Sequence, residues 1–421
     1  MNVYEAAQKR LEFIFEKYDH VLVAFSGGKD SGVMLNLAYE YAAKHNLLDK
    51  LSMYHLDYEA QYQLTTDYVT DTFKSFDGIK KYWCCVPIGA HCACSVSNKG
   101  YWIPWQESKK DIWVRKMPDS PCLYREKDID FPFTEGMRDY DFQEKFCQSI
   151  ADKYRGKLAV LVGIRADESL NRWRATLKDK EGLSWITVIS ENLTNCYPIC
   201  DWHTEDIWVA NAKFGWQYNR LYDLFYQAGV KLVDMRVASP FNDWAIKSLH
   251  LYKVIDPDNW ARMIGRVDGV NFAGLYGNTT AMGWRGIKLP PGHTWKSYAE
   301  FLLSTLPDEQ REHYARILKK SIEFWREKGG VLFDEQIDAM EALPDVQKTI
   351  ACSRISDDRQ VVKFSDYPDD VDLPQFAAYP SYKRFCVCIL KNDYYCKYMG
   401  FTFTKEALRK RKAALEKYRG L

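Results

Sequence analysis

The chain has 421 residues, 47% hydrophobic and 27% charged, which suits a soluble protein with a large buried core in two or three domains. Its 58 Lys and Arg nearly balance its 57 Asp and Glu, so no overall field favours nucleic acid or an anionic membrane. Residues 1–10 lack the apolar core of a signal peptide, and no run of about 18 apolar residues occurs. We therefore expect a cytoplasmic protein whose twelve cysteines stay reduced and mostly buried.

Apolar patterning in the first half of the chain predicts strands that alternate with helices. Residues 3–18 have helical spacing, residues 21–25 form a short apolar run typical of a buried strand, and helical spacing returns at 30–45. Such alternation implies right-handed βαβ units and a doubly wound parallel sheet. The remaining expected elements of this half are strands at 51–56, 81–86 and 158–164 and a helix at 65–76.

The regular pattern stops at residues 87–139, which are rich in Pro and Trp and have the length of a functional loop or lid. Beyond Ser239 we expect no strands. The sequence thus predicts a first domain at 1–238 and a mostly helical domain at 239–421. Helices of the second domain are expected at 243–254, 257–267, 296–304, 307–328 and 404–419.

The segment with the most specific chemistry joins the expected strand at 21–25 to the helix that follows. Its glycines allow a tight turn and close approach of the backbone to a ligand, while the start of the helix offers free amides and a positive dipole end to a phosphate. The nucleotide-triphosphatase P-loop and the Gly-x-Gly-x-x-Gly dinucleotide fingerprint are both absent. The six residues are Ser26, Gly27, Gly28, Lys29, Asp30 and Ser31.

This loop resembles the signature of the PP-loop family, whose members split ATP into AMP and pyrophosphate or bind a related sulfonucleotide. Two later runs resemble one branch, the phosphoadenosine phosphosulfate (PAPS) reductase-like proteins: VGIRADES at 162–169 and YPICDWHTEDIW at 197–208. The resemblance covers roughly residues 20–230. It implies a Rossmann-like α/β domain with a parallel twisted sheet that binds ATP or PAPS.

The C-terminal part is similar to the immunoglobulin-binding regulator A (IbrA) type subgroup of that branch, on the runs SPFND at 239–243, YKRFC at 382–386 and ILKND at 389–393. That subgroup is often paired with a ParB-like protein, so the resemblance implies such a partner.

Several polar residues follow the expected strands at the edge where the loop lies. Asp57 suits a role near the ribose or a metal-bound water, or else caps the next segment. Arg165, with Arg172 and Arg174 shortly after it, offers guanidinium forks for phosphate or sulfate, with salt bridges on a helix face as the alternative for the pair. The resemblance adds Gly163, Asp201 and Trp202 to the nucleotide site, the last two being alternatively part of a packed, capped helix.

Two further groups leave alternatives open. Cys84, Cys85, His91, Cys92 and Cys94 could ligate zinc, but their spacing lacks the usual two-residue gap, and buried small side chains are the preferred interpretation. Basic residues within 405–419 could contact nucleic acid phosphates or form a solvated helix face.

Three functions remain for comparison. In the first, the chain is an enzyme that cleaves ATP with Mg²⁺ and adenylates an unknown acceptor, with Lys29, Asp30 and Arg165 as the catalytic residues. In the second, it is a nucleotide-sensing subunit that acts through a protein partner. In the third it is a PAPS or sulfonucleotide reductase or a sulfurtransferase, although it lacks the C-terminal Glu-Cys-Gly-Leu-His motif that the family's reductases use.

Overall fold

The structure is a computed structural model of the chain. It divides into two compact units, each described by itself: Met1–His91, Tyr101–Pro240 and Leu249–Val267 form the first, and Cys92–Gly100, Phe241–Ser248 and Asp268–Leu421 the second. Each unit is therefore made of several separate stretches of the chain. The sequence, in contrast, suggested one boundary between residues 238 and 239. The structure describes residues 2–95, 98, 100–168, 185–232, 235–237, 239–243, 245–277, 289–332, 346–349, 360–370, 380–396 and 399.

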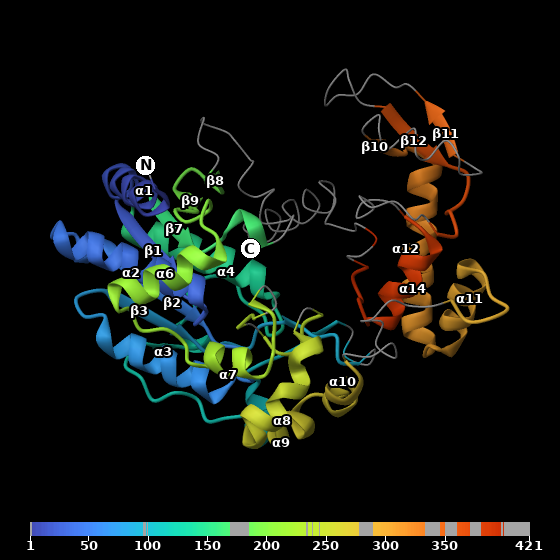
Figure 1. Ribbon diagram of the computed structural model, residues 1–421, viewed down its shortest axis with the longest axis horizontal. Helices are drawn as coiled ribbons and strands as arrows, with labels where there is room; N and C mark the ends of the chain where they lie inside the picture. Colours follow the sequence, from blue (N-terminus) through green and yellow to red (C-terminus); the bar gives the residue numbers. More distant parts are fainter. Residues whose placement is uncertain are drawn as a thin grey trace. The chain divides into compact units, whose positions relative to one another are not determined.

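A seven-stranded sheet in the order β6-β3-β2-β1-β7-β9-β8 forms the centre of the first unit (Figure 1). Every neighbouring pair is parallel except β8 and β9, which are antiparallel. The expected parallel α/β sheet is therefore confirmed. Its strands are β1 (His20–Ala24), β2 (Leu51–Leu56), β3 (Lys80–Cys84), β6 (Leu123–Tyr124), β7 (Leu158–Val162), β8 (Ile186–Val188) and β9 (Leu193–Cys196).

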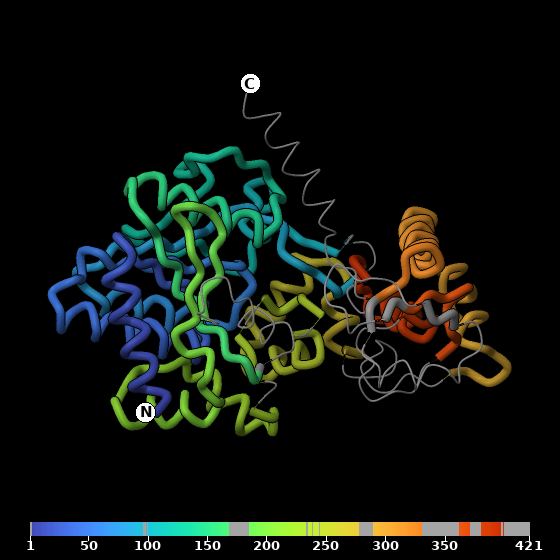
Figure 2. The backbone as a smooth tube through the Cα atoms, turned by 90° about the horizontal axis from the view of Figure 1, so that it is seen from above, coloured from blue at the N-terminus to red at the C-terminus, as the bar shows by residue number. Residues whose placement is uncertain are grey.

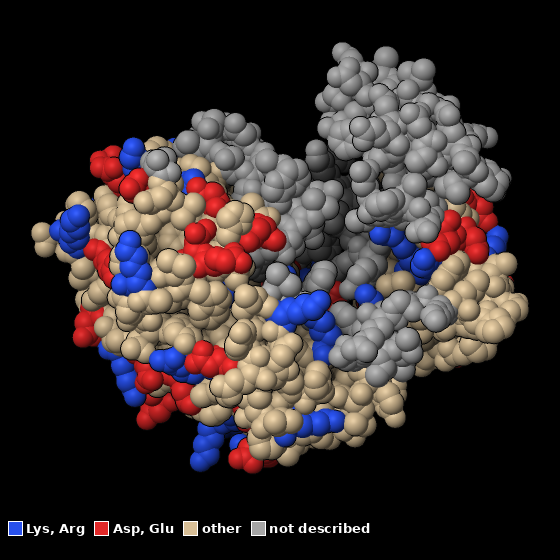
Figure 3. Space-filling model, viewed as in Figure 1, with Lys and Arg blue, Asp and Glu red and all other residues tan. Residues whose placement is uncertain are grey.

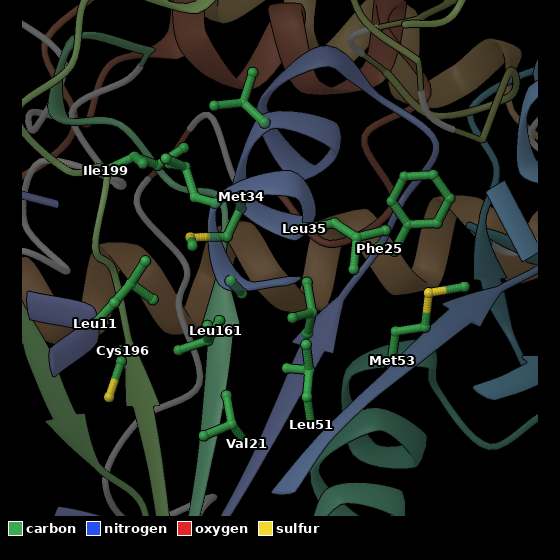
Figure 4. Packing of buried hydrophobic residues seen from close by; sticks show 14 of the residues in the cluster. Leu11, Val21, Phe25, Met34, Leu35, Leu51, Met53, Leu161, Cys196 and Ile199 are labelled. Atoms are coloured by element: carbon green, nitrogen blue, oxygen red, sulfur yellow. The ribbon is translucent and has the colours of Figure 1, made fainter. Parts of the chain in front are cut away.

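Helices cover both faces of this sheet because side chains alternate along each central strand. Val21 and Val23 of β1 belong to one buried cluster, and Leu22 belongs to another on the opposite face. The first cluster includes residues of α1 (Val3–Lys17), α2 (Lys29–Lys44), α3 (Gln63–Ser75) and α6 (Thr204–Phe214), and the second includes residues of α4 (Asp139–Tyr154). Figure 4 shows Met34 and Leu35 of α2 above the strands that carry Val21, Leu51, Met53 and Leu161.

Local signals explain several helix ends. The α1 helix begins after Asn2, whose side chain accepts a hydrogen bond from the Glu5 amide at 2.8 Å, while the Glu5 carboxylate accepts one from the Asn2 amide at 3.1 Å. The α6 helix ends at Gly215, where φ is +68°. The shorter elements of the first unit are η1 (Leu48–Lys50), β4 (Ala90–His91), β5 (Tyr101–Trp102), η3 (Glu107–Ile112), η4 (Glu126–Asp128), η5 (Ala166–Glu168), α7 (Leu221–Gln227), α8 (Tyr252–Ile255) and α9 (Pro257–Arg266).

The second unit contains strands, so the expectation of none beyond Ser239 was wrong. Its antiparallel sheet has the order β10-β12-β11. Each strand has only three to five residues, which is too short for periodicity to reveal over a window of about 11 residues. Its elements are α10 (Val270–Tyr276), α11 (Trp295–Thr305), α12 (Asp308–Glu327), β10 (Gly330–Leu332), β11 (Val346–Thr349), β12 (Gln360–Phe364) and α14 (Tyr382–Leu390).

The helix predictions for this half had mixed outcomes. Those at 257–267, 296–304 and 307–328 are confirmed by α9, α11 and α12. The segment predicted as one helix at 243–254 instead contains η7 (Ile246–Leu251) followed by the single turn α8. The helix predicted at 404–419 lies outside the described residues.

Candidate functional site

The candidate site lies where the order of the sheet reverses. From β1 the chain proceeds to β2 and then β3 on one side, whereas β7 pairs with β1 on the other side. Ligands of open α/β sheets bind at such a switch point, outside the carboxyl ends of the strands. The loop at 26–31 follows β1 and residues 163–165 follow β7, so the two sequence motifs meet there.

The loop takes a compact shape that requires its first glycine. Gly27 has φ of +79°, and a Cβ added there would lie 3.1 Å from Val69 and 3.2 Å from Thr65. The Ser26 and Ser31 hydroxyl oxygens lie 2.9 Å apart, and the Ser31 hydroxyl donates to the Gly28 carbonyl at 3.0 Å. These bonds hold the turn closed on itself before α2 begins.

Backbone amides of this turn are available to a ligand. Within the part of the chain that the structure describes, the amides of Gly27, Asp30 and Ser31 donate no hydrogen bond. The first amides of a helix have no partner inside the helix and carry its positive dipole end. The turn therefore has the donors that a phosphate group accepts from.

Two cations share one carboxylate at this turn. Lys29 Nζ lies 2.7 Å from Asp30 Oδ2, and Arg165 Nε lies 2.5 Å from Asp30 Oδ1. The Lys29 side chain is 6% exposed and that of Arg165 is 2% exposed. A second carboxylate, that of Asp167, lies 2.6 Å from the Arg165 guanidinium. All three predicted catalytic residues therefore lie in one ion-pair cluster.

Gly163 explains why the two motifs fit together. A Cβ added at this position would lie 3.0 Å from the Asp30 carbonyl and from the Ser31 amide nitrogen. Any larger residue would push the first turn of α2 away from β7. The glycine two residues before Arg165 thus permits the close approach that brings Arg165 to Asp30.

Two residues that the sequence did not point to form hydrogen bonds with the loop. Asn219 lies just before α7, and Tyr222 lies within it. Asn219 is fully buried, and its side-chain amide donates to the Gly27 carbonyl at 3.0 Å and to the Thr65 hydroxyl at 2.9 Å. The Lys29 amide donates to the Tyr222 hydroxyl at 3.1 Å. Asn219 lies two residues before α7 and accepts from the Leu221 amide at 3.0 Å, a local role at the start of a helix that gives no reason to link it to the loop.

Asp57 follows β2 as expected, but its carboxylate is fully buried against protein donors. The Arg115 guanidinium binds both of its oxygens, and the Trp83 indole donates to one at 2.7 Å. Burial acts to raise the pKa of Asp57, yet the charges of Arg115 and His55 and the Trp83 hydrogen bond outweigh it and lower the pKa. In this structure Asp57 thus anchors Arg115, a residue of the predicted insertion.

A second buried ion pair lies beside the first. Arg266 of α9 binds Glu59 with 2.9 and 3.1 Å contacts, and the Glu59 carboxylate also accepts from the Trp105 and Val114 amides at 2.7 and 2.9 Å. The two pairs attach the Trp-rich insertion and α9 to the end of β2.

Asp201 and Trp202 contact the N-terminal helix. The Arg10 guanidinium binds both Asp201 oxygens at 2.7 and 2.8 Å, and the buried Trp202 indole donates to the Val3 carbonyl at 3.1 Å. Figure 2 shows α1, in dark blue, alongside this part of the chain. Arg172 and Arg174 lie outside the described residues.

The cysteines that the structure describes are mostly buried. Burial raises the pKa of the Cys84, Cys85 and Cys94 thiols well above the usual value. Within the described residues, no group of three or more His, Cys, Asp or Glu side chains is arranged to hold a metal ion. No helix in the described part of the chain is long and apolar enough to cross a bilayer. The face in Figure 3 carries both acidic and basic side chains.

The fold and the site define an open α/β protein with a glycine-lysine loop at its topological switch point. The chain is 32% identical over 421 residues to the uncharacterized protein YbdN of Escherichia coli (strain K12), an alignment that covers 96% of this chain and 92% of that protein. The chain therefore belongs to the YbdN family. Residues 229–410 match the family model of a domain of unknown function, DUF3440.

Among solved structures, the chain is similar to the FMN adenylyltransferase of Candida glabrata in complex with FAD and inorganic pyrophosphate, with 17% identity and a TM-score of 0.31. The match covers 52% of this chain and 58% of that chain, so it spans less than two thirds of the adenylyltransferase. The phosphoadenylyl-sulfate (PAPS) reductase from Candida auris is similar at 17% identity and a TM-score of 0.30, covering 52% of this chain and 84% of that chain. The U34-tRNA thiolase NcsA from Methanococcus maripaludis is similar at 12% identity and a TM-score of 0.30, covering 64% and 78%.

Proposed function

We propose that the chain is a PP-loop enzyme that binds ATP with its phosphates on the loop at 26–31 and cleaves it to AMP and pyrophosphate, adenylating an acceptor. One observation carries this proposal. Loop amides that donate no hydrogen bond within the described part of the chain lie at the switch point together with two buried cations, Lys29 and Arg165. The amides and the two cations are donors that a polyphosphate can accept from, and Asp30 and Asp167 hold the cations in place.

The same groups have a chemical role in the proposed reaction. As pyrophosphate departs, negative charge grows on its oxygens, and preorganised donors stabilise that charge more than they stabilise the ground state. Lys29 supplies a point charge and the loop amides supply fixed dipoles. Arg165, held by Asp30 and Asp167, keeps its guanidinium close to the same turn.

Among the residues that the structure describes, the carboxylates of Asp30 and Asp57 are already paired with protein donors. Mg²⁺ is usually bound by one or two carboxylates together with substrate phosphates. Both oxygens of Asp30 already face cations, and those of Asp57 face Arg115 and Trp83. The proposal therefore assigns Mg²⁺ to the nucleotide phosphates and gives it no ligand from the chain.

The test is incubation of the protein with labelled ATP and Mg²⁺, followed by separation of AMP, ADP and pyrophosphate. Formation of AMP and pyrophosphate that is lost in Lys29→Ala supports the adenylating enzyme. Release of ADP and phosphate would contradict it.

A third outcome favours the alternative of a nucleotide sensor. ATP binding without turnover would point to a regulatory subunit, of the kind that the IbrA-type resemblance implies with its ParB-like partner. Copurification of the chain with such a partner, strengthened by ATP, would then be the next measurement.

A further inference from the structure

Tyr222 of α7 reaches the loop from a part of the chain about 190 residues away. Its side chain is buried, and its ring packs edge-on against Trp208 of α6 at 5.5 Å between ring centroids. The hydroxyl oxygen accepts the Lys29 amide at 3.1 Å, and it would lie 3.3 Å from a Cβ added at Gly28. Lys29 Nζ lies 5.7 Å from the centre of the same ring.

The Tyr222 hydroxyl accepts a hydrogen bond but donates none within the described part of the chain. A tyrosine hydroxyl has two acceptor lone pairs and one proton to donate. The Lys29 amide donates to the oxygen at 3.1 Å, and the Val237 amide lies close to it. Among the residues that the structure describes, no acceptor takes the proton.

The hydroxyl also keeps that proton at neutral pH. Burial raises the pKa of Tyr222, and the nearby Asp30 carboxylate raises it further, although the two amides act in the opposite direction. The group is therefore a neutral donor beside the loop, and the Lys29 amide already donates to its oxygen.

We propose that the Tyr222 hydroxyl donates a hydrogen bond to a phosphate oxygen of the ligand on the loop, and so acts as a binding residue for polyphosphates. This inference rests on the proposed function, because it needs a phosphate at residues 26–31. It adds a ligand contact from α7, outside every motif that the sequence analysis identified.

The chain offers a matched control in Tyr68. The Tyr68 hydroxyl lies against the same helix one turn further on, 2.6 Å from a Cβ added at Gly32. Its proton is already used, because it donates to the Gln217 carbonyl at 3.2 Å. Tyr68→Phe therefore removes a structural hydrogen bond beside α2 and leaves the donor at Tyr222 in place.

The experiment measures the affinities of ATP and inorganic pyrophosphate by calorimetry for the wild-type chain, Tyr222→Phe and Tyr68→Phe, with the melting temperature of each. Loss of a hydrogen bond to a charged group should weaken both ligands about 10-fold in Tyr222→Phe. Tyr68→Phe should bind both ligands as the wild type does. Equal affinity in Tyr222→Phe, or an equal loss in both variants, would overturn the inference.

Two further measurements distinguish a failure of the proposed function from a failure of the Tyr222 inference. If the wild-type chain binds neither ATP nor pyrophosphate, the proposed function itself fails. If Tyr222→Phe does not fold, incorporation of 3-fluorotyrosine at position 222 retains the hydroxyl and makes it a stronger donor. That variant should bind pyrophosphate more tightly than the wild type, and unchanged affinity would contradict the phosphate contact.

Discussion

Arg165 Nε lies 2.5 Å from Asp30 Oδ1. This ion pair joins the segment just after β7 to the first turn of α2, the helix that follows β1. The Arg165 side chain is only 2% exposed. Because a buried cation is stable only when it is paired, Asp30 holds this charge beside the loop in the absence of ligand. The loop at 26–31 and residues 163–165 therefore form a single preorganised unit.

The first prediction concerns the lysine of the loop. Lys29→Ala should weaken ATP binding by roughly 1–3 kcal/mol, the range for a lost hydrogen bond to a charged group. Thermal stability should change little, because Asp30 keeps its bond to Arg165. Calorimetric titration with ATP measures the effect. Lys44→Ala, an exposed lysine in the last turn of the same helix, is the control and should bind ATP normally.

The second prediction concerns the carboxylate between the two cations. Asp30→Asn removes the negative charge that Lys29 and Arg165 share, so the free energy of unfolding should fall by about 3 kcal/mol. The uncompensated positive charge should at the same time make inorganic pyrophosphate bind more tightly. Urea unfolding and calorimetry measure the two effects. A variant that is as stable as the wild type would show that the ion pairs do not hold the site.

The third prediction concerns the buried pair of Asp57 and Arg115. The pKa of Asp57 is lowered in the folded chain, so its contribution to stability is present above its unfolded value of about 3.8 and is lost as pH falls through the lower folded value. Asp57→Asn leaves Arg115 buried without its charge partner and should lower the free energy of unfolding by about 3–5 kcal/mol at pH 6.

The measurement for this pair is the free energy of unfolding against pH. The difference between the wild type and Asp57→Asn should be constant from pH 7 to 5 and should shrink below about pH 4. Asp77→Asn, with an Asp77 side chain that is 91% exposed, is the control. A difference that does not depend on pH down to about pH 2 would mean that the Asp57 carboxyl has the same pKa in the folded and unfolded chain, and would contradict the lowered pKa.

The fourth prediction concerns sulfur chemistry. A PAPS reductase needs a thiolate that attacks sulfur, but burial raises the pKa of Cys196 to about 12 and also raises that of Cys200. PAPS with a thioredoxin system should therefore give no sulfite, and mass spectrometry should detect no thiosulfonate on any cysteine. Sulfite production that one Cys→Ser change abolishes would place the chain among the reductases.

The sequence alone was sufficient for the central strands and for the loop. The apolar run before Ser26 is typical of a strand buried on both faces, and the helical spacing after it predicts the strand-loop-helix unit. These features are local: they depend on residues within about one element of each other. The strands of the second unit were missed because they are short and pair with residues distant along the chain, so their neighbours, rather than their own sequence, define them.

The partners of the site residues depended on the tertiary structure. Nothing near Asp57 in sequence indicates that Arg115, 58 residues later, takes both of its oxygens. Nothing near Lys29 indicates that its amide donates to Tyr222, 193 residues away. The sequence determined which residues carry charge and where the backbone can turn. Only the packing of β1 against β7, with α7 beside the loop, decided which of those groups meet, because a hydrogen bond depends on distance in space and not on separation along the chain.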